Sequence, residues 1–433
     1  MTLGDLGFLL AGLGGSLLGL FVPIMRLPAV LVLLISARSL TDIGSGSGDP
    51  LLPNTLLNGA ISIGLLVLVL FKNGRALPSS WTLLAAIGFS VIALATVVGL
   101  ANFGMAAESI QEGIRLLSVL AVFGTAARIG SDYPKALAKV MPWTVLPATI
   151  VFLVGSVLES SSSVQTSGRF VGTFSHANAA AAFMSVAALS CLGIWVFNRS
   201  RALLLAGIAS LPAMVLTQSL GGLAGFLAGA VAVLIINTRV ALGIRLVGLL
   251  GTTITVYVIT AFTRLGDRLE AVGASSSLAA TGSGDDSLSW RFLNWHLLVQ
   301  EWRSSPWFGY GLGSTSTQLM PLGQPPHSLP IQLLVETGIF GVTVTVVVLL
   351  FVLQRLVVSA AKGRWEASLL LGIFALMLVN GSESNLLGYT ATLYLIALIS
   401  GLLAARIVGD RSVTVESVVA DRKARTGVRR SGL

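Results

Sequence analysis

From Ser287 to Gly341 the chain reads SLSWRFLNWHLLVQEWRSSPWFGYGLGSTSTQLMPLGQPPHSLPIQLLVETGIFG. This stretch is the second half of a long polar interruption in a chain that is otherwise apolar. It contains two of the three histidines, His296 and His327, and alternating glycines between Gly309 and Gly313. Its last residues return to hydrophobic sequence. A titratable histidine therefore stands where a loop meets an apolar segment, as expected of a site that covers one end of a helix bundle.

The composition on either side of this stretch is that of an integral membrane protein. Of the 433 residues, 54% are hydrophobic and only 10% are charged, and the mean hydropathy is +0.88. Soluble domains carry about 25% charged residues. Apolar runs of about 17–25 residues recur along the chain, which is the length that crosses a hydrocarbon core as a helix. The first run has no basic leader, so we expect no cleaved signal peptide.

The apolar runs predict an all-α polytopic membrane helix bundle of about 12–13 transmembrane helices with one long external loop. The expected spans are 6–24, 27–40, 55–71, 80–99, 108–127, 141–158, 177–197, 202–218, 219–236, 243–263, 329–354, 366–384 and 388–406. The number depends on the N-terminus. If residues 6–40 form two short helices that turn at Arg26, there are thirteen spans and the N-terminus is external; one broken crossing gives twelve.

Basic residues occur in alternate connections and in the C-terminal tail. The positive-inside rule places such connections together on the cytoplasmic side. The net charge of +9 then reflects topology and does not indicate a nucleic-acid partner. The basic residues concerned are Lys72, Arg75, Arg128, Lys135, Lys139, Arg199, Arg201, Arg239, Arg245, Arg355, Lys362, Arg364, Arg411, Arg422, Lys423, Arg425, Arg429 and Arg430.

These patterns divide the chain into four parts. Residues 1–263 are expected to form an N-terminal transmembrane bundle of about nine or ten spans, and 329–407 the C-terminal transmembrane helices. Residues 264–328 form the external loop, whose second half places tryptophans at helical spacing and predicts an amphipathic surface helix. Residues 408–433 form a basic cytoplasmic tail. Within the bundle, glycines at every fourth position from Gly221 to Gly229 predict a face for close helix packing.

Two arginines on the external side suggest a site for phosphate. Arg169 precedes a span within GRFVGTFSHAN (168–178), and Arg291 lies in the predicted surface helix. Two guanidinium groups brought together would bind a phosphate or pyrophosphate through paired hydrogen bonds. The alternative for each arginine is that it reaches a lipid phosphate without any catalytic role.

The histidines differ in their expected roles. His327 is predicted in the first turn of a helix, where the positive end of the dipole disfavours protonation and favours a neutral general base. Glu336 follows two to three turns later, in a membrane segment where carboxylates usually pair with another group. For His176 the alternative to catalysis is a cap or a loop hydrogen bond, and His296 is expected at the membrane interface. Asp285 and Asp286 lack nearby ligands, so neither a metal nor a cofactor is expected.

Four motifs along the chain resemble those of the O-antigen ligase and polymerase family. They are G-R-F-x-G-T-F-x-H-x-N, R-x-x-x-W, P-x-x-G-x-G-x-G and P-H-x-L-x-x-Q-L-L-x-E-x-G-x-x-G, and they extend from about Arg169 to Gly341. The resemblance implies a multi-span, GT-C-like glycosyltransferase that needs no metal. It implies transfer of a glycan from undecaprenyl pyrophosphate to a sugar hydroxyl of a glycan or glycolipid acceptor, in cell-surface polysaccharide synthesis. The implied location is the bacterial cytoplasmic (inner) membrane, with the site on the periplasmic face and the C-terminus in the cytoplasm.

The resemblance also implies roles for individual residues. Arg169 and Arg291 correspond to the pair that holds the pyrophosphate, and His327 to the histidine that engages the acceptor hydroxyl. The substrate-binding set implied by the remaining motif positions and by the charged start of the external loop is His176, Asn178, Trp295, Gln332, Glu336, Arg264 and Arg268.

The chain departs from the family pattern at two positions. Ser328 follows the motif histidine where Asn is frequent, and Leu220 stands where Arg is usual. Arg264 or Arg268 is the candidate for the missing charge. These departures leave the choice between ligase and polymerase open. The alternative from a different class is a polysaccharide or lipid transporter (flippase), for which the chain shows no convincing internal repeat.

Overall fold

The computed structural model describes residues 27–42, 53–69, 79–103, 106–133, 135–158, 169–237, 241–243, 245–246, 248–250, 287–317 and 320–407. Within these residues seven helices are long and apolar enough to cross a membrane, and four further apolar helices are shorter. The predicted all-α polytopic membrane bundle is therefore confirmed. The expected span at 6–24, most of that at 243–263, and both Arg264 and Arg268 lie outside the described residues. The total number of crossings stays a prediction.

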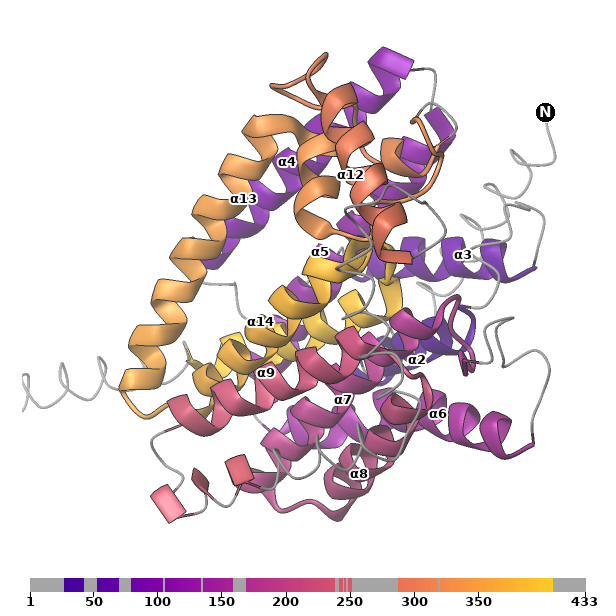
Figure 1. The fold of residues 1–433 in the computed structure, drawn as a ribbon. Helices are drawn as coiled ribbons and strands as arrows, with labels where there is room; N and C mark the ends of the chain where they lie inside the picture. Colours follow the sequence, from indigo (N-terminus) through magenta and orange to yellow (C-terminus); the bar gives the residue numbers. More distant parts are fainter. Residues whose placement is uncertain are drawn as a thin grey trace, which may run out of the picture.

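The helices follow the predicted spans closely (Figure 1). They are α2 (Leu27–Leu40), α3 (Pro53–Leu68), α4 (Ser79–Phe103), α5 (Ala106–Asp132), α6 (Ala136–Val157), α7 (Ala177–Asn198), α8 (Arg201–Leu216), α9 (Leu220–Ile236), α12 (Ser287–Trp302), α13 (Leu329–Ala361), α14 (Trp365–Glu383) and a last helix, Thr390–Ile407. Two short 3-10 helices, η3 (Ser314–Ser316) and η4 (Leu386–Gly388), stand in connections.

Small residues explain how the central helices approach one another. Helix α7 carries four consecutive buried alanines, Ala179–Ala182, in a bundle with α8 and α9. On α9, a Cβ added to Gly225 would lie 3.1 Å from the Leu376 carbonyl oxygen of α14. A Cβ on Gly229 would lie 2.8 Å from the Gly372 carbonyl oxygen. The predicted packing face of α9 is confirmed, because only glycine permits this backbone approach.

The two ends of the bundle differ in their polar residues. At one end Arg364 donates to the carbonyl oxygen of Ile407, and Arg406 pairs with Glu366 at 3.4 Å. The basic connection Arg199–Arg201 joins α7 to α8, and it lies at the end of α7 that is remote from residues 169–176. The connections at the opposite end, 169–176, 217–219, 320–328 and 384–389, hold the candidate site. The bundle thus has one end with basic connections and an opposite end with the candidate site.

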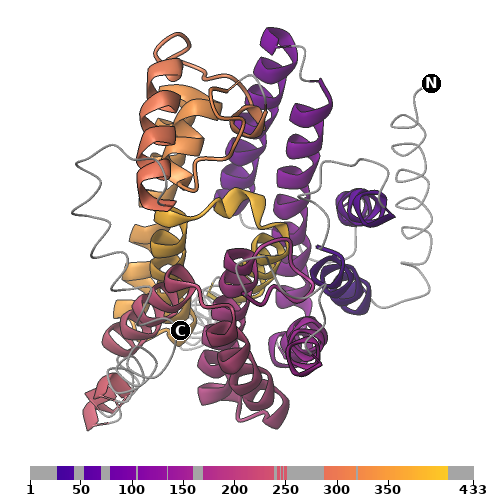
Figure 2. The same cartoon turned by 45° about the vertical axis from the view of Figure 1, so that its right-hand side comes forward.

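Helix α12 lies beside the first half of α13 at the upper end of the molecule in both views (Figures 1 and 2). The predicted helix in the second half of the polar loop is therefore present. Whether it lies on a membrane surface stays a prediction. It ends at Trp302, before Pro306, and the chain then turns through the glycine-rich segment.

Helix α13 is broken at Gly338, which has φ 64° and ψ −171°. The break leaves the carbonyl oxygens of Val335 and Glu336 without helical partners, and they accept hydrogen bonds from the amides of Tyr310 and Gly311, at 2.8 and 3.0 Å. The amides beyond the break are also satisfied. Those of Ile339 and Phe340 donate to the Pro306 and Trp307 carbonyl oxygens, at 2.9 and 3.1 Å. The glycine-rich segment therefore completes the hydrogen bonding of the broken helix.

The glycines of this segment are required by close backbone contacts. Gly309 and Gly311 have φ of 67° and 93°. A Cβ on Gly309 would lie 2.4 Å from the Val335 carbonyl oxygen, and one on Gly311 would lie 2.2 Å from the Cα of Gly99 in α4. Any other residue would push the segment away from α4 and α13. The motif glycines are thus explained by structure.

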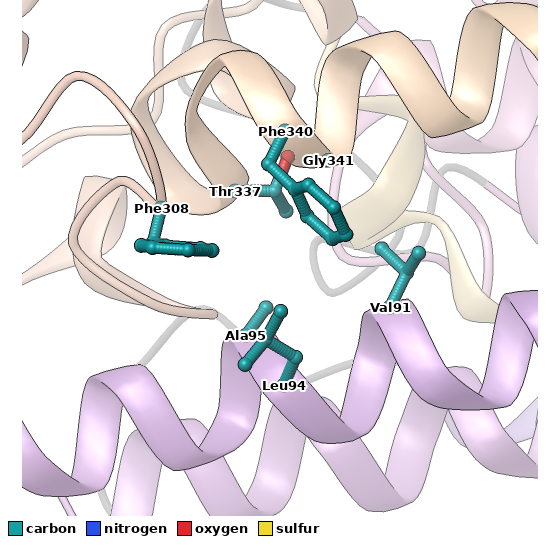
Figure 3. Close-up of a pocket in the computed structure, with 7 residues that line it drawn as sticks. All are labelled: Val91, Leu94, Ala95, Phe308, Thr337, Phe340 and Gly341. Carbon is teal, nitrogen blue, oxygen red and sulfur yellow. The ribbon is translucent and has the colours of Figure 1, made fainter.

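An apolar hollow lies where α4, α13 and this segment meet (Figure 3). Its lining is Val91, Leu94, Ala95, Phe308, Thr337, Phe340 and Gly341. It contains no titratable group, so it cannot supply acid–base or anion-binding chemistry. The candidate site lies among the polar connections at the end of the bundle described above.

Candidate active site

Arg169 is held in place by the protein. Its Nε donates to the Thr217 carbonyl oxygen at 3.0 Å, and its Nη2 donates to Asn178 Oδ1 at 2.7 Å. Ser219 Oγ donates to the same Asn178 oxygen at 3.0 Å. The side chain therefore joins the entrance of α7 to the α8–α9 turn. Asn178, predicted to bind substrate, positions Arg169 through this oxygen.

His176 forms the N-cap of α7. Its Nδ1 accepts a hydrogen bond from the Asn178 amide at 3.0 Å, so in the neutral ring the proton is on Nε2. The cap that the sequence offered as an alternative role is confirmed. The cap also orients the ring toward His327, whose ring centroid is 6.4 Å away. Capping and participation in the site are therefore compatible.

A buried ion pair supports the segment that precedes His176. Arg38 of α2 pairs with Asp42 at 2.5 Å, and both side chains are buried. The other Asp42 oxygen lies 3.5 Å from the amide nitrogen of Ser175 and 3.4 Å from its hydroxyl. Thr173 Oγ1 donates to the Ser39 carbonyl oxygen at 2.8 Å. Sequence reasoning missed this support, because nothing in the order of residues links α2 to the 169–176 segment.

His327 stands just before α13, whose N-cap is Ser328 and whose first residue is Leu329. The expected location in the first helical turn is therefore wrong by two residues, because the His327 backbone is not in a right-handed helical conformation. His327 instead has φ 49°, in the left-handed region that costs a residue with a side chain about 1–3 kcal/mol. The surrounding contacts hold it there. Trp290 lies 6.0 Å away, ring to ring, at a tilt of 62°.

Helix α12 fixes the three residues before His327. Asn294 is fully buried, and its Nδ2 donates to the Gln324 carbonyl oxygen at 3.2 Å and to that of Pro325 at 3.4 Å. The indole N–H of Trp295 donates to the Pro326 carbonyl oxygen at 2.6 Å. Trp295, predicted to bind substrate, thus uses its polar atom to hold the loop. Asn294 was not singled out from the sequence, since a single Asn in a helix carries no recognisable pattern.

The environment of His327 keeps its imidazole neutral. Burial lowers the pKa of His327 to about 4, and the positive charge of Arg291 lowers it further in the same direction. Its Nδ1 is buried and has no hydrogen-bond partner among the described residues. A neutral ring with an uncommitted nitrogen is suited to accept a proton.

Arg169 and Arg291 both lie within charge–charge reach of Tyr389. The buried hydroxyl of Tyr389 has its pKa raised by burial, and the charges of Arg291 and Arg169 both lower it. The charges of both guanidinium groups therefore reach the Tyr389 hydroxyl, although the two arginines are 122 positions apart in the sequence (169 and 291). Within the described part of the chain, the Arg291 guanidinium makes no hydrogen bond or ion pair.

Gln332 and Glu336 belong to a separate buried cluster. Glu336 accepts from Thr315 Oγ1 at 2.6 Å and from Gln332 Nε2 at 3.2 Å, and both α13 side chains are buried. The carboxylate lies close enough to the Glu112–Arg115 pair of α5 to interact with its charges. Its hydrogen bonds therefore hold η3 against α13, and the predicted substrate contacts of this pair stay a prediction.

The remaining histidine is peripheral. His296 is exposed on α12, and its Nε2 lies 2.8 Å from Gln300 Nε2. This agrees with the expected interfacial location, although no membrane is part of the structure. Within the described ranges, no group of three His, Cys, Asp or Glu side chains is placed to hold a metal ion.

One family model matches the chain, and its description is O-Antigen ligase. The match covers residues 205–346 and thus includes Arg291, His327, Gln332 and Glu336, whereas Arg169 and His176 precede it. No curated protein matches the chain in sequence. The matched segment extends from α8 through the broken first half of α13 and includes three of the four predicted motifs, whereas the motif at 168–178 precedes it. Residues 205–346 are therefore similar to the O-antigen ligase family, and the predicted resemblance is confirmed over this segment.

Proposed function

We propose that this protein is a membrane glycosyltransferase that moves a glycan from a polyprenyl-pyrophosphate carrier, expected to be undecaprenyl pyrophosphate, to a hydroxyl group of an acceptor sugar. The observation that carries the proposal is the combination of two arginine charges with the imidazole of His327. The Arg291 guanidinium, which makes no hydrogen bond or ion pair with a described residue, lies within charge–charge reach of the buried His327, and the charges of Arg291 and the fixed Arg169 both reach Tyr389. Two permanent positive charges beside a base suit a reaction with an anionic leaving group.

The proposed reaction is one displacement at the anomeric carbon of the donor sugar. The acceptor oxygen attacks this carbon while the bond between the carbon and the pyrophosphate oxygen breaks. The electron pair of that bond leaves on the pyrophosphate, and the hydroxyl proton passes to His327. The products are a glycosidic bond and the polyprenyl pyrophosphate, and the imidazolium then returns its proton to solvent.

Each arginine would stabilise the charge that grows on the departing pyrophosphate. Such a preorganised donor contributes about 3–4 kcal/mol to transition-state stabilisation. The position of His327 next to Arg291 adds a second effect. The guanidinium keeps the imidazole unprotonated before the reaction, and the pyrophosphate would offset that positive charge when the donor binds, making the ring more basic.

The proposed orientation places the candidate site on the external face of the bacterial cytoplasmic membrane. Its support is the separation of the site from the basic connections at the other end of the bundle, which the positive-inside rule assigns to the cytoplasm. The C-terminal tail would then be cytoplasmic, since the last helix runs from the site end to the basic end. The polyprenyl chain would lie among lipid-facing helices.

The test is a transfer assay with purified protein, a polyprenyl-pyrophosphate glycan and a panel of acceptors, with mass analysis of the products. Transfer to a glycolipid core would indicate a ligase, and extension of the glycan itself would indicate a polymerase. The His327→Ala variant should lose transfer by about 10²- to 10⁴-fold while keeping normal expression. Full activity in both His327→Ala and Arg291→Ala would contradict the proposal. Accumulation of substrate in vesicles without a covalent product would favour a transporter.

A further inference from the structure

The connection between α14 and the last helix, residues 384–389, has no role in the function proposed above. It lies between the two halves of the site. On one side the Glu383 carboxylate lies against Gly221, where an added Cβ would be 2.4 Å from Glu383 Oε1. Gly221 follows the 217–219 turn that accepts the hydrogen bond of Arg169. The connection therefore starts beside the Arg169 half.

The same connection reaches the His327 half through apolar contacts. A Cβ added to Gly381 of α14 would lie 3.2 Å from the Leu329 side chain and 3.6 Å from that of Leu386. Leu329 is two residues beyond His327, and Leu386 opens the short helix η4. Residues 384–389 are thus packed between the loop that holds Arg169 and the start of α13.

Tyr389 is the side chain that this packing holds in place. It is only 7% exposed, and its amide donates to the Leu386 carbonyl oxygen at 3.0 Å. The Ser384 side chain lies near its hydroxyl, and the Ser384 hydroxyl itself donates to the Asn380 carbonyl oxygen. A buried aromatic ring with few torsions keeps its hydroxyl at a defined position.

We propose that Tyr389 is a third anion-binding residue of this site, whose hydroxyl donates a hydrogen bond to the pyrophosphate of the lipid-linked donor between Arg169 and Arg291. The inference rests on the proposed function and extends it to a residue outside the motifs. Residues 384–389 are packed between the two halves of the site, and both guanidinium charges reach this hydroxyl, so an anion bound between the halves would lie near it.

The chemistry of a tyrosine hydroxyl fits this position. Burial raises its pKa, so the oxygen keeps its proton and remains a donor throughout the working pH range. The proton stays on Tyr389 throughout the displacement, and no bond of the residue breaks. A neutral donor adds a hydrogen bond to the leaving group without adding another positive charge, which would lower the basicity of His327 further.

The chain provides a matched control five residues further along, just inside the last helix. Tyr394, in the last helix, is fully buried, and its hydroxyl lies 2.9 Å from Ser62 Oγ and 2.5 Å from Ser118 Oγ. Tyr389→Phe and Tyr394→Phe each remove one buried hydroxyl from neighbouring positions. We expect Tyr389→Phe to lower kcat by about 10- to 100-fold, the value of a hydrogen bond to a charged group. Tyr394→Phe should lower the unfolding temperature and leave kcat unchanged.

A second readout separates anion binding from structural support. Inorganic pyrophosphate should inhibit transfer by the wild type in competition with the donor, and Tyr389→Phe should raise its inhibition constant by about tenfold. Fluorotyrosine placed at position 389 retains the hydroxyl and thus the fold. Its fluorine resonance should shift when inorganic pyrophosphate is added, whereas fluorotyrosine at position 394 should not respond.

The outcomes distinguish this inference from the proposed function. Wild-type kcat and inhibition in Tyr389→Phe, with Arg291→Ala inactive in the same assay, would overturn the role of Tyr389 and leave the proposed function standing. If the fluorine resonance at position 389 did not shift when pyrophosphate was added, the role of Tyr389 would also be overturned, even if Tyr389→Phe did not fold. A wild type that responds to pyrophosphate at 389 but forms no product with any acceptor would contradict the proposed function alone.

Discussion

Arg169 and Arg291 act on the same buried hydroxyl, but the protein holds them in opposite ways. Arg169 donates to Thr217 and Asn178 and is part of the contact between α7 and the α8–α9 turn. Arg291 makes no hydrogen bond or ion pair with any described residue, although its charge reaches His327 and Tyr389. One guanidinium is thus positioned by the fold, and the other has no such contact within the described residues.

The difference separates support from function within one site. A half-buried positive charge costs stability where its solvation is reduced and no neighbouring residue compensates it, and none of the described residues does so for Arg291 by a hydrogen bond or an ion pair. Such a cost is expected where a ligand will supply the missing anion. Arg38, which is buried against Asp42, shows the alternative, in which a nearby carboxylate neutralises the arginine. Substitutions can test whether the two site arginines differ as this comparison requires.

The largest effect is expected for Arg291→Ala. Loss of a charged donor to the leaving group should lower transfer by about 10³-fold, while the unfolding temperature changes little because no hydrogen bond or ion pair to a described residue is lost. Arg303→Ala provides the control, since Arg303 is an exposed arginine just beyond the same helix. Comparable activities of the two variants would show that Arg291 has no special role.

Arg169→Gln should affect both activity and stability. Thr217 and Asn178 lose their charged partner, so the free energy of unfolding should fall by about 1–3 kcal/mol, and transfer should fall by about 10²-fold. Kinetic assays and thermal unfolding in one detergent would measure both. If Arg169→Gln lost activity at unchanged stability, as Arg291→Ala is expected to do, the two arginines would not differ in the way described here.

Asp42→Ala tests the support behind the Arg169 half. It leaves Arg38 buried without its partner, which should cost about 3–5 kcal/mol of stability. Transfer should fall by about tenfold, because Ser175 loses its contact and the segment before His176 loosens. The double variant Arg38→Met with Asp42→Leu should regain much of the stability but not the activity. Recovery of both would mean that the pair serves stability alone.

The smallest effect is a displaced pH profile. His327 must be neutral to accept a proton, so kcat/KM, which reports the free enzyme, should rise as the pH increases through about 4 and show no inflection near the ordinary value of 6.5. Since folding lowers this pKa, the neutral ring contributes stability above pH 6.5, and that contribution is lost as the pH falls toward 4. In Arg291→Ala the acidic limb of the residual activity should move to higher pH. His296→Ala should leave the profile unchanged, and a limb that stayed near 6.5 in the wild type would contradict the assignment.

The sequence predicted the helices well because their cause is local. Each span is a run of apolar residues of the length needed to cross a bilayer, and α2, α7 and α9 agree with the predicted ranges to within one residue at each end. The glycines of α9 predicted close packing for the same reason, since small side chains at every fourth position lie on one helix face. The break of α13 was not predicted, because a single glycine at 338 gives no sign that a distant segment will complete the hydrogen bonds of the helix.

For the candidate site, the residue types were predictable and their partners were not. The motifs singled out Arg169, Arg291 and His327 from chemistry and resemblance. The uses of Asn294, Asp42 and Tyr389 depend on contacts between segments far apart in the chain, and they follow no periodic pattern. The location of His327 was also misjudged, since the residue precedes the helix and owes its low pKa to burial and to Arg291.

The amino-acid sequence by itself therefore determined the membrane bundle, the separation of basic and site-bearing connections, and the identity of the charged and titratable groups. These properties follow from hydrophobicity, charge and spacing along the chain. Only the tertiary structure decided which arginine is hydrogen-bonded to described residues and which is not, and which tyrosine hydroxyl both charges reach. Burial and charge–charge reach depend on distances across the bundle, and those distances exist only once the helices have packed.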